Sequence, residues 1–83
     1  MVVEIGFRAI DDKRAEVIYQ VIDEMISRGD TIFNRDVVAT ESLLRLNLKG
    51  ERYISIVRRE VTWCFKLMGA TQYSKKAWII KKE

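Results

Sequence analysis

The sequence predicts a small α+β domain in which three helices are followed by a short β-hairpin. Apolar residues recur at intervals of three and four in three successive segments, which is the period of an amphipathic helix. After Gly69 the pattern changes to two short runs with aromatic and β-branched residues, which is typical of strands. We expect one domain over 1–83, with an N-terminal strand or arm at 1–10, a three-helix core at 11–69 and a hairpin at 70–83.

The N-terminal segment alternates apolar and polar residues from 3 to 10, which predicts a short half-buried strand or an extended arm. Two partners are open for it, the C-terminal hairpin or a second copy of the chain. Asp11 or Asp12 then caps the first helix, and Gly29 ends it. The apolar positions of this helix are Ala15, Val17, Ile18, Tyr19, Val21, Ile22, Met25 and Ile26. Because this arc is wider than one stripe, we expect the helix to contact elements on two sides or a second subunit.

The next segment contains two breaks. Residues 31–33, Thr-Ile-Phe, are long enough only for one strand rung or a tight connector. Asn34 is a favourable cap for a second helix over 35–46. Asn47 with Gly50 then marks the break before a third helix.

The third helix is predicted from Gly50 to Gly69, and it carries two opposite stripes. One stripe is apolar and suits a core: Ile54, Val57, Val61, Phe65 and Met68. The other is polar and cationic: Arg52, Ser55, Arg59, Thr62 and Lys66. At about 100° per residue, each set stays within a narrow band of the helix surface. The cationic stripe suits a nucleic-acid groove, because cations neutralise phosphates while short polar groups approach backbone or bases. The alternative is an ordinary solvated helix face.

Other side chains of the third helix have different expected roles. A second apolar stripe consists of Ile56, Trp63 and Leu67. It predicts a core contact or a subunit interface rather than a platform for stacking bases. Arg58 is turned by about 100° from the cationic stripe, so we expect it to pair with Glu51, Asp36 or another acid.

The C-terminal hairpin is predicted from runs at 70–73 and 77–82, with Ser74-Lys75-Lys76 as a basic turn between them. The two-residue Asn-Gly turn is missing. Lysines at a hairpin tip also provide solubility and protect the sheet edge, so by themselves they are weak evidence of function.

Charge is segregated along the chain. Residues 1–44 hold five Lys and Arg against nine Asp and Glu, a balance of −4, and residues 45–83 hold ten against three, a balance of +7. The folded molecule is therefore expected to have a positive side and an anionic partner.

Several classes of function lack the residues that they need. With no histidine, no glycine-rich phosphate loop and no Cys/His metal set, we expect no enzyme activity, cofactor, metal or small-molecule ligand. The single Cys64 lies between aromatic residues and is predicted to be a small buried hydrophobe. The adjacent acids Asp11-Asp12 and Asp23-Glu24 are expected to cap helices or face solvent. Apolar runs stay well short of the roughly 18 residues of a membrane span, and no signal peptide is recognisable, so the expected location is cytoplasmic. Abundant Ile, Val, Lys and Glu favour a thermophilic source.

The order of the predicted elements resembles that of winged helix-turn-helix domains over roughly residues 12–82. The matching segments are Asn34-Arg35-Asp36-Val37-Val38-Ala39, Tyr53-Ile54-Ser55-Ile56-Val57-Arg58-Arg59, Leu67-Met68-Gly69-Ala70 and Tyr73-Ser74-Lys75-Lys76-Ala77-Trp78. The resemblance implies that the third helix enters the major groove with its N-terminal half, and that the hairpin, or wing, touches the neighbouring backbone or minor groove. By position it makes candidate groove contacts of Arg52, Tyr53, Ser55 and Arg59, and a wing tip of Lys75 and Lys76. The link between the second and third helices is longer here than in typical members.

These patterns together predict a protein that binds double-stranded DNA, as a small transcriptional regulator acting as a homodimer. The candidate DNA contacts are Arg52, Tyr53, Ser55, Arg59, Thr62, Lys66, Lys75 and Lys76. Of these, Lys66 is expected to touch backbone or solvent rather than bases. Two alternatives stay open: a winged-helix subunit that mediates protein contact in a replication, transcription or ribosomal assembly, and RNA binding.

Overall fold

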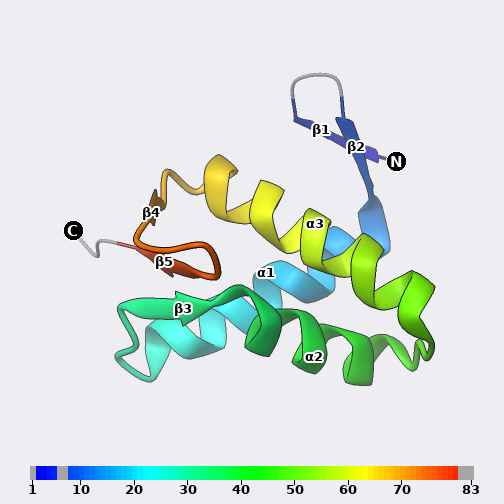
Figure 1. Ribbon diagram of the computed structural model, residues 1–83, viewed down its shortest axis with the longest axis horizontal. Helices are drawn as coiled ribbons and strands as arrows, with labels where there is room; N and C mark the ends of the chain where they lie inside the picture. Colours follow the sequence, from blue (N-terminus) through cyan, green and yellow to red (C-terminus); the bar gives the residue numbers. More distant parts are fainter. Residues whose placement is uncertain (1, 6–7, 81–83) are drawn as a thin grey trace.

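The computed structural model describes residues 2–5 and 8–80. The elements are β1 (Val2–Ile5), β2 (Arg8–Asp11), α1 (Asp12–Ser27), β3 (Ile32–Asn34), α2 (Arg35–Leu46), α3 (Glu51–Leu67), β4 (Thr71–Gln72) and β5 (Ala77–Ile79). Three helices make up most of the body, and a three-stranded antiparallel sheet lies at one end of them (Figure 1). This confirms the prediction of a small α+β protein with a C-terminal hairpin.

The sheet joins segments that are distant in the sequence. Its strand order is β3-β5-β4, so β5 is central and pairs antiparallel with both neighbours. Trp78 of β5 lies opposite Phe33 of β3 and Gln72 of β4. The strands predicted around 70–73 and 77–82 are thus confirmed, although residues 81 and 82 lie outside the described part of the chain. Of the two alternatives predicted for 31–33, the strand is the one that forms, over Ile32–Asn34.

The N-terminal segment departs from the prediction of a single strand over 3–10. β1 and β2 pair with each other as an antiparallel hairpin, with Val3 opposite Ile10 and Glu4 opposite Ala9. The strand therefore takes its neighbour in sequence as its partner, and not the C-terminal hairpin. One physical reason favours this: pairing with a neighbour in sequence costs less chain entropy than pairing with a distant segment. In Figure 1 the hairpin projects from the start of α1 past α3.

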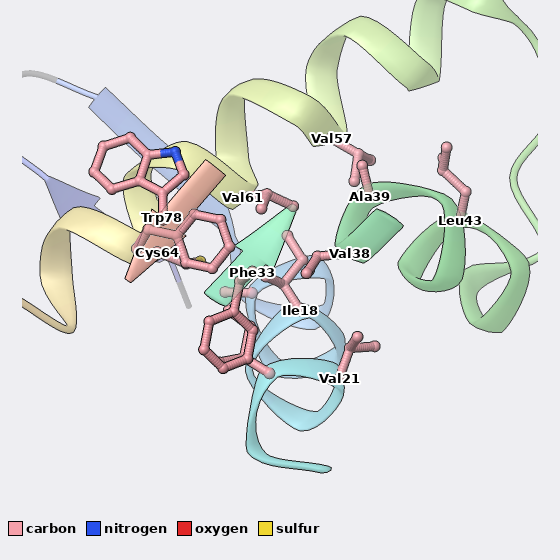
Figure 2. Close-up of a cluster of buried hydrophobic side chains, with 13 residues drawn as sticks. Ile18, Val21, Phe33, Val38, Ala39, Leu43, Val57, Val61, Cys64 and Trp78 are labelled. Atoms are coloured by element: carbon pink, nitrogen blue, oxygen red, sulfur yellow. The ribbon is translucent and has the colours of Figure 1, made fainter. Parts of the chain in front are cut away.

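The core is built around Phe65 of α3. Its ring stacks on Trp78 of β5 with centroids 5.6 Å apart, and it is tilted against Phe33 of β3 with centroids 6.2 Å apart. Figure 2 shows this cluster continuing through Val61 and Ile18 between the helices. The buried hydrophobic residues are Ala15, Ile18, Val21, Ile22, Phe33, Val38, Ala39, Leu43, Val57, Val61, Cys64, Phe65 and Trp78. Five predicted core residues are only partly buried at its edge: Tyr19, Met25, Ile26, Ile54 and Met68.

Both ends of α2 follow the predicted caps. Asn34 Oδ1 accepts hydrogen bonds from the backbone N–H of Asp36 at 2.8 Å and of Val37 at 3.2 Å. These bonds satisfy donors that have no partner inside the helix. At the other end Asn47 has a φ of 56°, in the left-handed region, and its N–H donates to the carbonyl O of Leu44 at 3.2 Å. The helix therefore keeps the bounds predicted from sequence.

The starts of the other two helices are close to their predicted positions. Gly50 precedes α3 with a φ of 107°, a backbone conformation in which a residue with a side chain would be strained. α3 begins at the next residue, Glu51. α1 begins at Asp12, one of its two predicted caps, and the side chain of Asp11 lies outside the described part.

A buried ion pair connects α1 to the middle of α3. Glu60 is only 2% exposed, and its two carboxylate oxygens accept from Arg14 Nε at 2.7 Å and Arg14 Nη2 at 3.0 Å. The two-point contact neutralises the carboxylate and supplies hydrogen bonds that water would otherwise provide. Sequence patterns did not predict this pair, because its partners are 46 residues apart.

Removal of the Glu60 carboxylate should destabilise the protein. We expect Glu60→Ala to lower the free energy of unfolding by about 2–3 kcal/mol, because it removes the two-point contact with Arg14 and opens a space in the core. The expected loss of stability is smaller than for a fully buried ion pair, because the Arg14 side chain is 28% exposed and water can solvate its charge in the variant. Urea unfolding measures the free energy of unfolding of both proteins. Glu16→Ala, on the exposed side of α1, is the control, and its free energy of unfolding should lie within about 0.5 kcal/mol of wild type. Equal stability of the two variants would contradict the prediction.

Candidate nucleic-acid interface

The cationic stripe lies on the exposed side of α3. Val57, Val61 and Phe65 are fully buried, which fixes the rotation of the helix about its own axis. The opposite side carries four exposed residues of the stripe: Arg52, Ser55, Arg59 and Lys66. The fifth, Thr62, is half-buried, and its Oγ1 donates to the carbonyl O of Arg58 at 3.2 Å. Because this hydroxyl is satisfied within the helix, Thr62 is the weakest candidate of the five.

The neighbouring flank of α3 carries its remaining apolar side chains. Tyr53 is 38% exposed in the first turn, and helix geometry places it on the side of Ile56 rather than over the cationic stripe. Trp63 is half-buried and packs against the core, whereas Leu67 is 46% exposed. The second apolar stripe is thus part of the core at Trp63, and it is open to solvent at Leu67.

The turn between β4 and β5 presents the two predicted lysines. The Ser74 N–H donates to the carbonyl O of Ala77 at 3.2 Å, and the Ala77 N–H donates to Ser74 Oγ at 3.3 Å, so the turn is closed by its own residues. Lys75 and Lys76 are exposed. Tyr73 is 69% exposed beside them and is not among the candidates predicted from sequence. The signal that could have found it is an aromatic residue next to a basic turn.

This turn is also tied to the start of α2. The backbone N–H of Arg35 donates to the carbonyl O of Lys76 at 2.7 Å. In addition, β5 pairs with β3, which ends at Asn34 and leads directly into α2. Backbone hydrogen bonds therefore connect the turn to the start of α2.

Asp36 lies where α2, α3 and the turn meet. Its Oδ1 accepts from Arg35 Nε at 3.1 Å and forms an ion pair with Arg58 Nε at 3.2 Å. Its Oδ2 lies 3.5 Å from Lys76 Nζ. Partial burial pushes the pKa of Asp36 upwards, but the hydrogen bond from Arg35 and the three positive charges outweigh burial and lower the pKa below its usual value. Arg58 thus pairs with one of the acids expected for it, and Lys76 has an internal partner.

A groove of about 610 Å³ lies between α1 and α2. Its apolar lining includes Val21, Met25 and Val37. Along its edge, Arg45 binds the Glu24 carboxylate through Nη1 at 2.6 Å and Nη2 at 2.7 Å, and this hydrogen-bonded pair lowers the pKa of Glu24. No sequence pattern predicted this groove, because it is formed by two helices that meet only in the folded chain.

Cys64 is fully buried in the core, as predicted. Burial is the main cause that raises the pKa of its thiol to about 12. A hydrogen bond from Tyr19 lowers the pKa of the thiol, whereas the negative charge of Glu60 raises this pKa further. Burial also raises the pKa of Tyr19 to about 12. The thiol is therefore not nucleophilic at neutral pH. Within the residues that the structure describes, no group of three or more His, Cys, Asp or Glu side chains is placed to hold a metal ion.

Comparisons with protein-family models, with curated proteins and with solved structures found no match. No helix within 2–5 and 8–80 combines the length and the apolar character that crossing a bilayer requires. The geometry defines a small α+β protein with three helices, a three-stranded antiparallel sheet and an exposed cationic stripe on α3.

The raised pKa of Cys64 has a consequence for stability at alkaline pH. The folded thiol titrates near 12 and the unfolded thiol near 9.0, so its contribution is complete below pH 9.0 and is lost as the pH rises towards about 12. Over this interval one such group lowers the free energy of unfolding by up to about 1.4 kcal/mol per pH unit. Urea unfolding between pH 8 and about 11 should therefore show a shallower loss for Cys64→Ala than for wild type. Parallel curves would show that the thiol does not titrate differently in the two states.

Proposed function

We propose that this protein binds double-stranded DNA without catalysing a reaction, as a winged-helix protein with α3 in the major groove. The observation that carries the proposal is the exposed stripe of Arg52, Ser55, Arg59 and Lys66 on α3. Support comes from the element order α1-β3-α2-α3-β4-β5, in which β5 pairs with both β3 and β4, since this arrangement is compatible with a winged helix. The turn at residues 73–76 takes the place of the wing.

The stripe has the dimensions and the chemistry for this role. α3 has 17 residues and is about 25 Å long. A helix with its side chains is about 10–12 Å across, so it fits into a major groove that is about 12 Å wide. The cations release counterions from phosphates, which supplies affinity that is independent of sequence and falls with salt. Arg52 and Arg59 lie on the outer face, where a guanidinium can bind the O6 and N7 of guanine with both ends of its fork. Lys66, further along the helix, is assigned to backbone contact.

We extend the proposal to a homodimer that regulates transcription. The observations in favour are apolar side chains left in solvent, Leu67 at 46% and Leu44 at 71% exposure, and the β1–β2 hairpin that projects from the body (Figure 1). Two-fold pairing would separate two α3 helices by about 34 Å along DNA, the spacing of successive major grooves on one side of the duplex.

One specific observation favours a second candidate, a winged-helix subunit whose partner is another protein. Val37 is 54% exposed and lines the groove between α1 and α2. Leu44 is 71% exposed and lines a second groove, formed by α2, the link after it and α3. Exposed apolar side chains next to a groove are typical of protein-binding surfaces. Weak binding to any nucleic acid would favour this candidate.

The distinguishing experiment is a titration of the protein with random duplex DNA and with duplex and single-stranded RNA, each at about 50 and 150 mM salt. The proposal expects measurable binding to duplex DNA at the lower salt and a steep loss at the higher one. Negligible affinity for duplex DNA at low salt would overturn it. Tighter binding to RNA than to DNA would indicate that the cationic face binds RNA.

The double variant Arg52→Ala, Arg59→Ala tests the stripe itself. We expect a loss of duplex affinity of at least about tenfold and a salt dependence shallower by about two phosphate contacts. Its melting temperature should stay within a few degrees of wild type, because both side chains are exposed. Lys13→Ala, Arg28→Ala removes the same charge from the start of α1 and from the turn that follows it, and serves as the matched control. Similar affinities for the two double variants would show that net charge, rather than the stripe, determines binding.

A further inference from the structure

Asp36 places a negative charge among three cations next to the face proposed to bind DNA, and one of the three, Lys76, belongs to the turn that takes the place of the wing. Asp36 is the second residue of α2, and its side chain is 25% exposed. The three cations around it come from three different segments: Arg35 from α2, Arg58 from α3 and Lys76 from the turn between β4 and β5. Such a convergence is not produced by neighbours along one helix face.

The three cations have hydrogen-bond donors that do not contact the Asp36 carboxylate. Both arginines contact the carboxylate through Nε, and a guanidinium carries further N–H donors on its two Nη groups. The side chain of Arg58 is 44% exposed and that of Lys76 is 56% exposed, so solvent and ligands can reach both. Three positive charges against one carboxylate leave the cluster net positive, with geometry suited to an oxyanion.

The carboxylate is itself an oxyanion in such a cluster. It occupies donors that a phosphate would use, and its charge repels a phosphate brought to the same cations. The rest of the cationic face lies along the exposed side of α3, so a duplex seated there would bring phosphates near the junction with α2 and the turn. A negative charge at this junction opposes binding to every duplex equally, since every duplex presents the same phosphates.

We propose that Arg35, Arg58 and Lys76 form a subsite for a backbone phosphate, and that Asp36 weakens this subsite by competing for the same cations. The inference rests on the proposed function and deepens it, because it names the ligand of one part of the face, a phosphodiester group, and an internal competitor for it. The expected consequence is a reduced affinity for random DNA. Contacts to bases are unaffected, so the affinities for specific and for random duplexes fall by the same factor and their ratio stays the same.

Asp36→Asn is the direct test, because asparagine keeps the shape of the side chain and one oxygen that can accept from the arginines. In a fluorescence titration with random duplex DNA, we expect about three- to tenfold tighter binding than wild type and a steeper salt dependence by about one phosphate contact. Asp23→Asn removes the same charge from an exposed position of α1 and should change the affinity by less than about twofold. In the background of Arg58→Ala, the gain from Asp36→Asn should shrink, since one of the released cations is absent.

The opposite results would overturn the proposal. If Asp36→Asn binds as Asp23→Asn does, the carboxylate does not compete with phosphate. If it binds more weakly than wild type, Asp36 instead positions the cations. Both outcomes leave the proposed function standing, whereas a wild-type protein that fails to bind duplex DNA removes the proposed function as well. Should Asp36→Asn fold poorly, Asp36→Ser, which is well tolerated at a helix start, takes its place.

Discussion

The stacking of Phe65 against Trp78 and Phe33 is the contact on which the rest of the structure depends. It joins α3, the helix that carries the cationic stripe, to the central strand β5 and to the edge strand β3 of the sheet. Trp78 is 4% exposed, yet its Nε1 has no hydrogen-bond partner among the described residues. An unsatisfied buried donor costs about 1–3 kcal/mol, so ring burial and stacking must offset this cost. A domain of 83 residues buries a smaller share of its surface than a large domain does, so one aromatic cluster is a large part of the core.

Polar contacts around that core determine how the helices are oriented. Arg14 and Glu60 hold α1 against α3, Arg45 and Glu24 hold α2 against α1, and Asp36 connects α2 to α3 through Arg58. These contacts differ in burial, and therefore in energy. The carboxylate of Glu60 is buried and depends on its partner, whereas the Glu24 pair is exposed to screening by salt. Helix orientation is thus most strongly specified at the middle of α3, at a position turned by about 100° from Arg59 of the cationic stripe.

Local signals were sufficient to predict most of the fold, and contacts between distant segments were not. The helix at 35–46 was predicted with its bounds because Asn34 and Asn47 are caps that act within a few residues. The exposure of Arg52 and Arg59 followed from helical period once the opposite stripe was assigned to the core. The N-terminal hairpin was mistaken for a single strand, because alternation specifies the faces of a strand and not its partner. Pairing partners likewise depend on the assembled fold: periodicity left Glu51, Asp36 and other acids open as partners of Arg58, and no local signal indicated the partner of Glu60.

The hydrogen bond from the Arg35 N–H to the carbonyl O of Lys76 affects how this face can meet a ligand. It adds to the β3–β5 pairing, so the lysine turn and the start of α2 move as one unit with the sheet that Phe65 attaches to α3. A surface held in this way is ordered before any ligand arrives, and little conformational entropy is lost on contact. Association is then a rigid docking event whose rate depends on diffusion, orientation and charge. Differences between ligands should consequently lie in how slowly each complex dissociates.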